Sequence, residues 1–268
     1  MSDALENDST GPESEKDLGQ ILAGWAYEPG TINVRRITGL DGLPKLQMRL
    51  ELGLLQMEVT GRPDGQRPHG FESLLEYHHH RLTEARQKSG GILEGFALSP
   101  DDCSQLREEA AMYYQRYLSL FVLGDFPAVV RDTSRNLRVL DLCGQYAVQE
   151  QDRILLEQYR PYIVMMRTRA AASILFKDQK LNEALATVRE GLSQIRAFFD
   201  KFGQSEAFAR SEEVKVLKRF AREIKRKLPV GVVERLERKL KKAVAAEEYE
   251  LAAKLRDEIA SLQAQNAR

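Results

Sequence analysis

The sequence predicts an α+β protein that is mostly α, with a small N-terminal antiparallel β unit followed by an antiparallel helical array that ends in a helical hairpin. Apolar residues alternate from Leu46 to Leu52, which is typical of a strand with one buried face. From Phe71 onward the apolar spacing changes to three or four residues, which is typical of helices. Near the C-terminus two such stripes flank a short reversal, and this pattern predicts the hairpin.

The first residues, MSDALENDSTGPESEKD, hold six acids and a single base and lack the apolar core of a secretion signal. We therefore expect residues 1–20 to form a disordered acidic tail of a cytoplasmic protein. The composition, 43% hydrophobic and 30% charged, excludes a wholly disordered chain. The longest apolar stretch, Tyr117 to Leu123, is far short of the roughly 20 residues that a membrane-spanning helix needs, so no membrane association is expected.

Residues 21–98 are predicted to form the small β unit and one helix. The apolar residues stand at even positions up to Leu52 and at odd positions from Leu55, so a β-bulge or a tight reversal is expected near Gly53. Asp41-Gly42 indicates a hairpin that joins this run to an earlier strand at 32–38. The turn at 62–65, Arg-Pro-Asp-Gly, closes the sheet.

Residues 99–228 are predicted to form a helical scaffold. The helix of the preceding unit follows Phe71 and ends at Gly90-Gly91. The scaffold begins at Ser99-Pro100, which with two following acids is a helix N-terminal signal. From there to the end, the periodicity predicts helices over 101–123, 126–146, 150–177, 180–202, 209–227, 232–246 and 249–265.

Two stretches of the scaffold, 113–143 and 168–199, share a helix-link-helix pattern. The sequence Leu-Asn-Glu-Ala-Leu at 181–185 resembles the small-residue crossing of a tetratricopeptide repeat. Arg116 departs from that pattern, because a small packing residue is expected there. The resemblance implies either a tetratricopeptide-like helical fold or a true repeat array, and a true array needs about three repeats.

Residues 229–268 form the predicted hairpin, and its second part, EYELAAKLRDEI at 248–259, closely resembles the UVR motif of the excision-repair proteins UvrB and UvrC and of some Clp-protease regulators. Tyr249 stands where that family usually has phenylalanine, and Ala252-Ala253 and Arg256-Asp257 match its residues. Glu247 departs from an apolar residue that is common at that place.

The resemblance implies a bacterial protein whose hairpin binds another protein, which can itself carry a UVR motif. The residues expected to carry the contact are Tyr249, Ala252, Ala253, Leu255 and Ile259. The alternative is that the hairpin packs on its own chain, because so small a hairpin buries little apolar area by itself.

A basic run offers a second class of function, because twelve bases and three acids lie between Lys215 and Lys242 although the whole chain has a formal net charge of +0. Phosphate contacts are expected from Lys218, Arg222, Lys225 and Arg226. The run contains a single aromatic residue, Phe220, for base stacking, so nucleic-acid binding by it is expected to be non-specific and salt-sensitive.

Metal and catalytic sites are not expected. Consecutive residues on a helix point about 100° apart, so His78, His79 and His80 cannot converge on one ion, and we expect His78 to lie on the apolar face. Cys103 and Cys143 lack metal-ligand spacing and are expected to be reduced and half-buried. No phosphate-binding loop, serine elbow or HExxH pattern occurs, so neither a cofactor nor a catalytic residue is expected.

We therefore interpret the sequence as that of a non-enzymatic adaptor that binds a partner protein through its C-terminal hairpin. The alternative is a nucleic-acid-associated protein of a DNA-repair complex that uses the basic run. A third hypothesis, an enzyme with a site in the β unit between Trp25 and Val59, lacks a cluster of reactive groups.

Overall fold

The computed structural model describes residues 17–88, 95–228 and 232–266. The chain divides into two compact units, Met1–Phe220 and Ala221–Arg268, and the division falls within a helix. The first holds the β unit and most of the helices, and the second holds the C-terminal hairpin.

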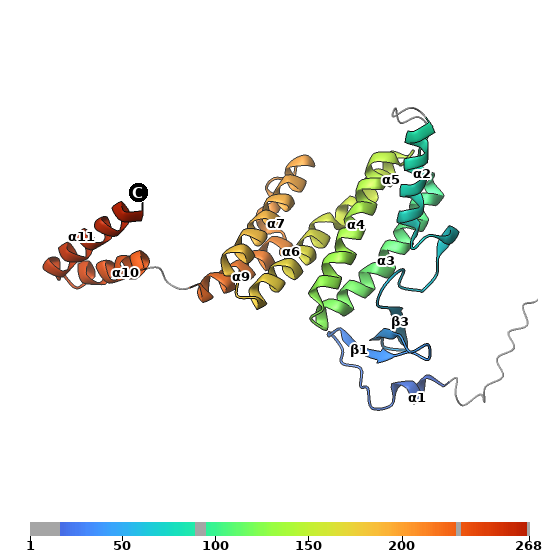
Figure 1. Cartoon of the computed structure of the whole chain (residues 1–268), viewed down its shortest axis with the longest axis horizontal. Helices are drawn as coiled ribbons and strands as arrows, with labels where there is room; N and C mark the ends of the chain where they lie inside the picture. Colours follow the sequence, from blue (N-terminus) through green and yellow to red (C-terminus); the bar gives the residue numbers. More distant parts are fainter. Residues whose placement is uncertain (1–16, 89–94, 229–231, 267–268) are drawn as a thin grey trace, which may run out of the picture. The chain divides into compact units, whose positions relative to one another are not determined.

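The β unit is a three-stranded antiparallel meander of β1 (Asn33–Thr38), β2 (Pro44–Arg49) and β3 (Leu54–Glu58), in that order (Figure 1). The central strand is the buried one, since residues 45–48 are all buried. Leu46 lies opposite Met57 in the register, and both contribute to the core. The predicted small antiparallel sheet is confirmed.

Both strand connections are tight reversals. In the first, Gly42 has a φ of +76°, which glycine adopts without steric cost, and the Gly39 N–H donates to the Leu43 carbonyl at 2.8 Å. In the second, the Leu50 N–H donates to the Gly53 carbonyl at 2.9 Å. The change of apolar phase near Gly53 is therefore a chain reversal and not a bulge.

The predicted acidic tail lies outside the described residues up to position 16, and a short helix begins within its last residues. The short helix α1 (Leu18–Leu22) begins at Asp17, whose carboxylate accepts a hydrogen bond from the Gly19 N–H at 2.8 Å. The capping aspartate explains the helix, because it satisfies an N–H group that would otherwise lack a partner.

The four long helices α3, α4, α6 and α7 of the first unit pack in that order. In Figure 1, α3 lies beside α4, α4 beside α6, and α6 beside α7, and these are also the pairs in contact. The bounds are α2 Leu74–Lys88, α3 Pro100–Val122, α4 Phe126–Tyr146, α5 Glu150–Leu155, α6 Arg160–Lys177, α7 Leu181–Lys201, α8 Ala207–Arg210 and α9 Glu212–Lys227, with 3-10 turns at Pro68–Gly70 and Glu157–Tyr159. The predicted end of α2 at Gly90-Gly91 lies outside the described residues.

Two predicted helices are broken, and a local cause is visible at each break. The helix expected over 150–177 stops at Leu155 and restarts as α6, and Pro161 near the start of α6 lacks the N–H that would donate to the Glu157 carbonyl in a continuous helix. The helix expected over 209–227 is divided into α8 and α9 by Ser211, whose hydroxyl accepts from the Val214 N–H at 3.2 Å.

A buried arginine joins the helices to the sheet. Arg116 on α3 is 1% exposed and donates to both carboxylate oxygens of Asp132 on α4, at 2.7 and 2.9 Å. It also donates to the backbone carbonyls of Glu58 and Gly61, at 3.1 and 2.8 Å. Arg116, which departs from the tetratricopeptide pattern, therefore connects α3, α4 and the end of β3. The tetratricopeptide-like fold itself stays a prediction.

A second buried carboxylate caps α2 from another helix. Glu109 on α3 is fully buried and accepts from the backbone N–H groups of Leu74 and Leu75, at 2.8 and 3.4 Å. It also pairs with Arg135 on α4. The start of α2 is thus held by a residue 35 positions away, because these N–H groups lack a partner within their own helix.

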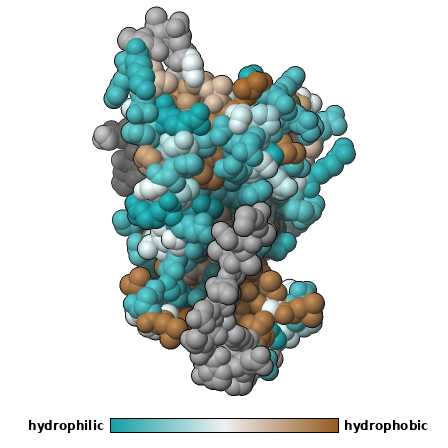
Figure 2. Space-filling model, turned by 90° about the vertical axis from the view of Figure 1, so that its right-hand side faces the viewer, coloured by the Kyte–Doolittle hydropathy of each residue, from teal (hydrophilic) through white to brown (hydrophobic). Residues whose placement is uncertain are grey.

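The surface of the β unit carries exposed leucines. Leu40 and Leu52, at the two strand reversals, are almost fully exposed, and Leu43 is 56% exposed. Figure 2 shows the larger hydrophobic groups of that face in its lower part, where the β unit lies, and smaller groups above them. Nothing in the fold covers these side chains among the described residues.

Candidate interaction sites

The hairpin of the second unit is formed by α10 (Val232–Ala245) and α11 (Tyr249–Asn266). The side chains of the two predicted stripes meet between the helices, and the buried cluster consists of Leu236, Ala243, Ala252, Leu255 and Ile259, with Leu240 packed against it. Alanines at two of these positions let the helices approach closely. The predicted hairpin is confirmed.

The reversal between the two helices is a Schellman motif, a helix C-terminal cap with one left-handed residue. The Glu248 N–H donates to the Ala243 carbonyl at 2.9 Å, and the Glu247 N–H donates to the Val244 carbonyl at 3.1 Å. Glu247 has a φ of +60°, a conformation that disfavours every residue with a β-carbon. The departure from the family pattern at Glu247 therefore falls on the one strained position of the turn.

The predicted contact residues are divided between the interior and the surface of the hairpin. Ala252, Leu255 and Ile259 are buried against α10 and hold the hairpin together. Tyr249 is 68% exposed, and Ala253 is exposed as well. Tyr249 and Ala253 are therefore open to contact from outside the hairpin, whereas the other three side chains are not.

The turn end of the hairpin carries an open groove of about 550 Å³ that the sequence did not predict. Its lining combines acids with exposed apolar groups and consists of Glu247, Glu248, Tyr249, Glu250, Leu251 and Lys254. By contrast, α10 carries five exposed bases and two acids. The hairpin thus has an acidic apolar tip and a basic first helix.

The sequence of the hairpin is similar to a known motif. Residues 231–265 match the UvrB/uvrC motif. This UVR match covers α10 and all but the last residue of α11, which is a small part of the chain, so it describes the hairpin alone. Among curated proteins and solved structures no significant match to the chain is found.

The predicted phosphate-binding residues all lie on α9 and outside the UVR match. Lys218, Arg222, Lys225 and Arg226 are exposed. Lys218 also lies over the ring of Phe208, at 5.6 Å from its centroid. Phe220, the one aromatic residue of the basic run, packs against Phe176 and is half-buried, so it is poorly placed to stack on a base.

The three adjacent histidines point in different directions, as expected from helical geometry. The His78 side chain is 1% exposed and that of His80 is 51% exposed. The Arg81 guanidinium lies 3.0 Å from His78 Nδ1. Burial lowers the pKa of His78 to about 4, against a smaller opposing effect of Asp102, so the ring is neutral near pH 7 and accepts from Arg81.

The two cysteines are fully buried rather than half-buried, in α3 and α4 of the first unit. Burial raises the pKa of the Cys103 thiol and raises that of Cys143 to about 12. Both are therefore poor nucleophiles.

Neither a metal site nor a membrane span is found in the described ranges. Within 17–88, 95–228 and 232–266, histidine, cysteine and carboxylate side chains do not gather in groups of three that could hold an ion. No helix among the same residues is both long and apolar enough to cross a bilayer.

Proposed function

We propose that the chain is a non-enzymatic adaptor that binds another protein through the turn end of its UVR hairpin. The observation that carries the proposal is the exposed apolar cluster at this end: Tyr249 is 68% exposed, Val244 52% and Leu251 46%, although the hairpin already has a buried core of its own. Large apolar side chains clustered on a surface are typical of a binding site, and tyrosine is enriched where binding energy concentrates.

The charge at the tip indicates what kind of surface the partner presents. Glu247, Glu248 and Glu250 surround Tyr249 in the groove, so a partner surface with bases around an apolar centre fits it best. The first helix of this chain's own hairpin, α10, has such a composition, with five exposed bases and the exposed Val244. The charges therefore favour a partner protein that carries its own UVR hairpin.

The test is affinity purification from the native cytoplasm with the full chain as bait. The variant Tyr249→Ala with Leu251→Ser removes exposed apolar groups and leaves the buried cluster intact. The matched control is Glu258→Ala, an exposed position on the same helix about 13 Å further along its axis. We expect a partner to be retained by the wild type and by the control and to be lost from the double variant.

Equal retention by all three chains would contradict the proposal. The variant Leu255→Ala separates a lost surface from a lost fold, because Leu255 lies inside the hairpin. If both variants lose the partner while circular dichroism shows that the double variant keeps its helix content, the tip itself is the contact.

A second candidate function is non-specific nucleic-acid binding by α9, and it is favoured by the exposure of all four predicted bases, Lys218, Arg222, Lys225 and Arg226. Replacing all four with glutamine should weaken retention on double-stranded DNA. Retention by the wild type should also fall steeply between 50 and 200 mM salt, by about tenfold or more for several phosphate contacts. DNA retention that does not change with salt excludes this candidate.

A further inference from the structure

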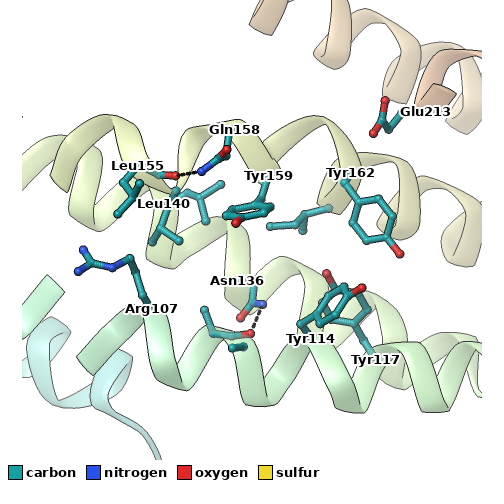
Figure 3. Close-up of a pocket in the computed structure, with 14 residues that line it drawn as sticks. Arg107, Tyr114, Tyr117, Asn136, Leu140, Leu155, Gln158, Tyr159, Tyr162 and Glu213 are labelled. Carbon is teal, nitrogen blue, oxygen red and sulfur yellow. Dashed lines mark hydrogen bonds between the residues drawn. The ribbon is translucent and has the colours of Figure 1, made fainter. Parts of the chain in front are cut away.

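A cavity of about 700 Å³ lies between the helices of the first unit, apart from the UVR hairpin. Its walls come from α3, α4, α6 and the first turn of α9, and the segment 155–159, which runs from the end of α5 to the start of α6, closes one side (Figure 3). The volume falls within the roughly 300 to 1,000 Å³ that is usual for ligand pockets. The break that Pro161 introduces before α6 places the segment 155–159 along this wall.

Tyrosines dominate the wall of the cavity. Tyr114, Tyr117, Tyr159 and Tyr162 all line it, and Figure 3 shows Tyr159 and Tyr162 across the cavity from Tyr114 and Tyr117. The rings of Tyr114 and Tyr117 meet edge to face at 5.4 Å, and those of Tyr114 and Tyr162 lie 6.1 Å apart. Packed rings of this kind form a rigid apolar surface with hydroxyl groups at its edge.

Most polar side chains of the cavity wall are engaged within the chain, and one charged group remains for a ligand. Arg107 pairs with Asp152 at 2.7 Å, and the side-chain amides of Asn136 and Gln158 donate to backbone carbonyls. Glu213 accepts from the Ser211 hydroxyl at 2.7 Å and takes part in no salt bridge within the described part of the chain. The cavity therefore offers a carboxylate and no uncommitted cation.

The tyrosine hydroxyl groups of the cavity are uncharged near pH 7, which also favours a cationic over an anionic ligand. Burial is the main cause that raises the pKa of Tyr162 to about 12, and the nearby Glu213 carboxylate adds to it. Burial also raises the pKa of Tyr117. Neutral hydroxyls beside an unpaired carboxylate favour a cationic group and disfavour phosphate or another anion.

We propose that this cavity binds a peptide segment of a partner protein, with an apolar side chain inserted among the tyrosines and a following lysine or arginine paired with Glu213. A peptide is favoured over a small molecule because the apolar surface continues beyond the cavity. Tyr159 is 54% exposed at the rim, Leu155 39%, and Ile154 before it 50%. An extended apolar rim around a pocket for an anchor residue is the usual arrangement of a peptide-binding surface.

The test uses the full chain and an array of 12-residue peptides, each with one leucine or phenylalanine followed at varied spacing by lysine, serine or glutamate. We expect binding to the lysine series and little to the glutamate series. For the best lysine peptide, Glu213→Gln should weaken the affinity about fivefold, the effect of one partly exposed ion pair. The matched control Glu212→Gln should leave it unchanged, since Glu212 does not line the cavity and pairs with Lys215 at 2.7 Å.

A second variant fills the cavity without removing a core residue. Ala111 lines it and is exposed, so Ala111→Trp places a bulky ring in the space at little cost to the fold. Peptide affinity should fall at least tenfold, with an unchanged melting temperature. The proposal is overturned if no series binds, if the glutamate series binds as well as the lysine series, or if Ala111→Trp binds like the wild type.

Discussion

The two units of the chain are stabilised in different ways. The first is fixed by buried charges as well as apolar packing, since Arg116, Asp132 and Glu109 are each about 1% exposed or less and bond across elements that are far apart in the sequence. The hairpin is held by a small cluster of leucine, isoleucine and alanine. Buried charge pairs require defined geometry, whereas a small apolar cluster tolerates adjustment.

This difference is consistent with the proposed functions of the two units, a ligand-binding cavity in the first and a protein-binding hairpin in the second. A scaffold whose helices are tied by directional bonds can hold a cavity such as the tyrosine-lined one in a fixed shape. A hairpin with little buried area is of low stability by itself and gains stability when a partner covers its exposed tip.

The largest expected effect is on the scaffold, from Arg116→Ala. Removal of this side chain leaves Asp132 buried without its two-pronged partner, and it frees two backbone carbonyls. We expect the free energy of unfolding of the first unit to fall by about 3 to 5 kcal/mol, measured by urea denaturation.

Arg131→Ala is the control for that variant, because Arg131 pairs with the same Asp132 but its side chain is 42% exposed. It should cost about 1 kcal/mol or less. Equal losses of unfolding free energy for the two variants would show that the burial of Arg116 contributes nothing to stability. The conclusion that buried charges stabilise the first unit would then be wrong.

Acid should weaken the scaffold and spare the hairpin. The pKa of His78 falls from an ordinary 6.5 to about 4 in the folded chain, so between these values the unfolded chain binds a proton that the folded chain does not. Stability is therefore full above about pH 6.5 and declines as the pH falls toward 4, by up to about 3 kcal/mol. The second unit, 221–268, contains no histidine.

Urea denaturation at several pH values between 4 and 7 measures this decline, with His78→Phe as the comparison. The variant keeps a ring of similar size on the apolar face and cannot titrate, so its stability should change less over that range. A variant with the same pH dependence as the wild type would assign the acid sensitivity to other groups.

The sequence predicts the second unit more completely than the first. The stripes that contain Leu236 and Leu255 lie close together in the chain, so helical periodicity alone is enough to pair them. The exposure of the Tyr249 side chain does not follow from residue spacing. Helical periodicity does not say whether a side chain at the start of α11 is buried between the two helices or exposed at the turn.

The tyrosine-lined cavity could not be predicted in the same way. Tyr114 and Tyr159 come from helices whose packing depends on tertiary contacts and on the break before Pro161. Arg116 stood out as a misfit in a repeat pattern, and that misfit was a signal of buried polar contacts. Glu109 gave no such signal, since an acid on a helix is usually solvated.

Leu255→Ala tests the small core of the hairpin. Leu255 is 7% exposed, and truncation of a buried leucine costs at least about 2 kcal/mol. Amide hydrogen exchange in α10 and α11 should accelerate roughly thirtyfold, while exchange in α3 and α4 stays unchanged. The control Leu251→Ala, 46% exposed on the same helix, should have little effect, and acceleration across the scaffold would mean that the two units unfold together.

The smallest expected effect is a gain, from Glu247→Gly. The same Schellman geometry occurs in both units at a residue with a β-carbon, at Glu247 in the hairpin and at Gln179 between α6 and α7, with φ values of 60° and 61°. Glycine relieves that strain, and its greater freedom in the unfolded chain offsets part of the gain, so about 1 kcal/mol remains. Glu247→Gly should slow hydrogen exchange in α10 and α11 about fivefold, and Gln179→Gly should raise the global stability of the scaffold by a similar amount. If Glu247→Gly instead accelerates exchange in the hairpin, residue 247 does not adopt the left-handed conformation in solution. The placement of Tyr249 at an ordered turn would then also be wrong.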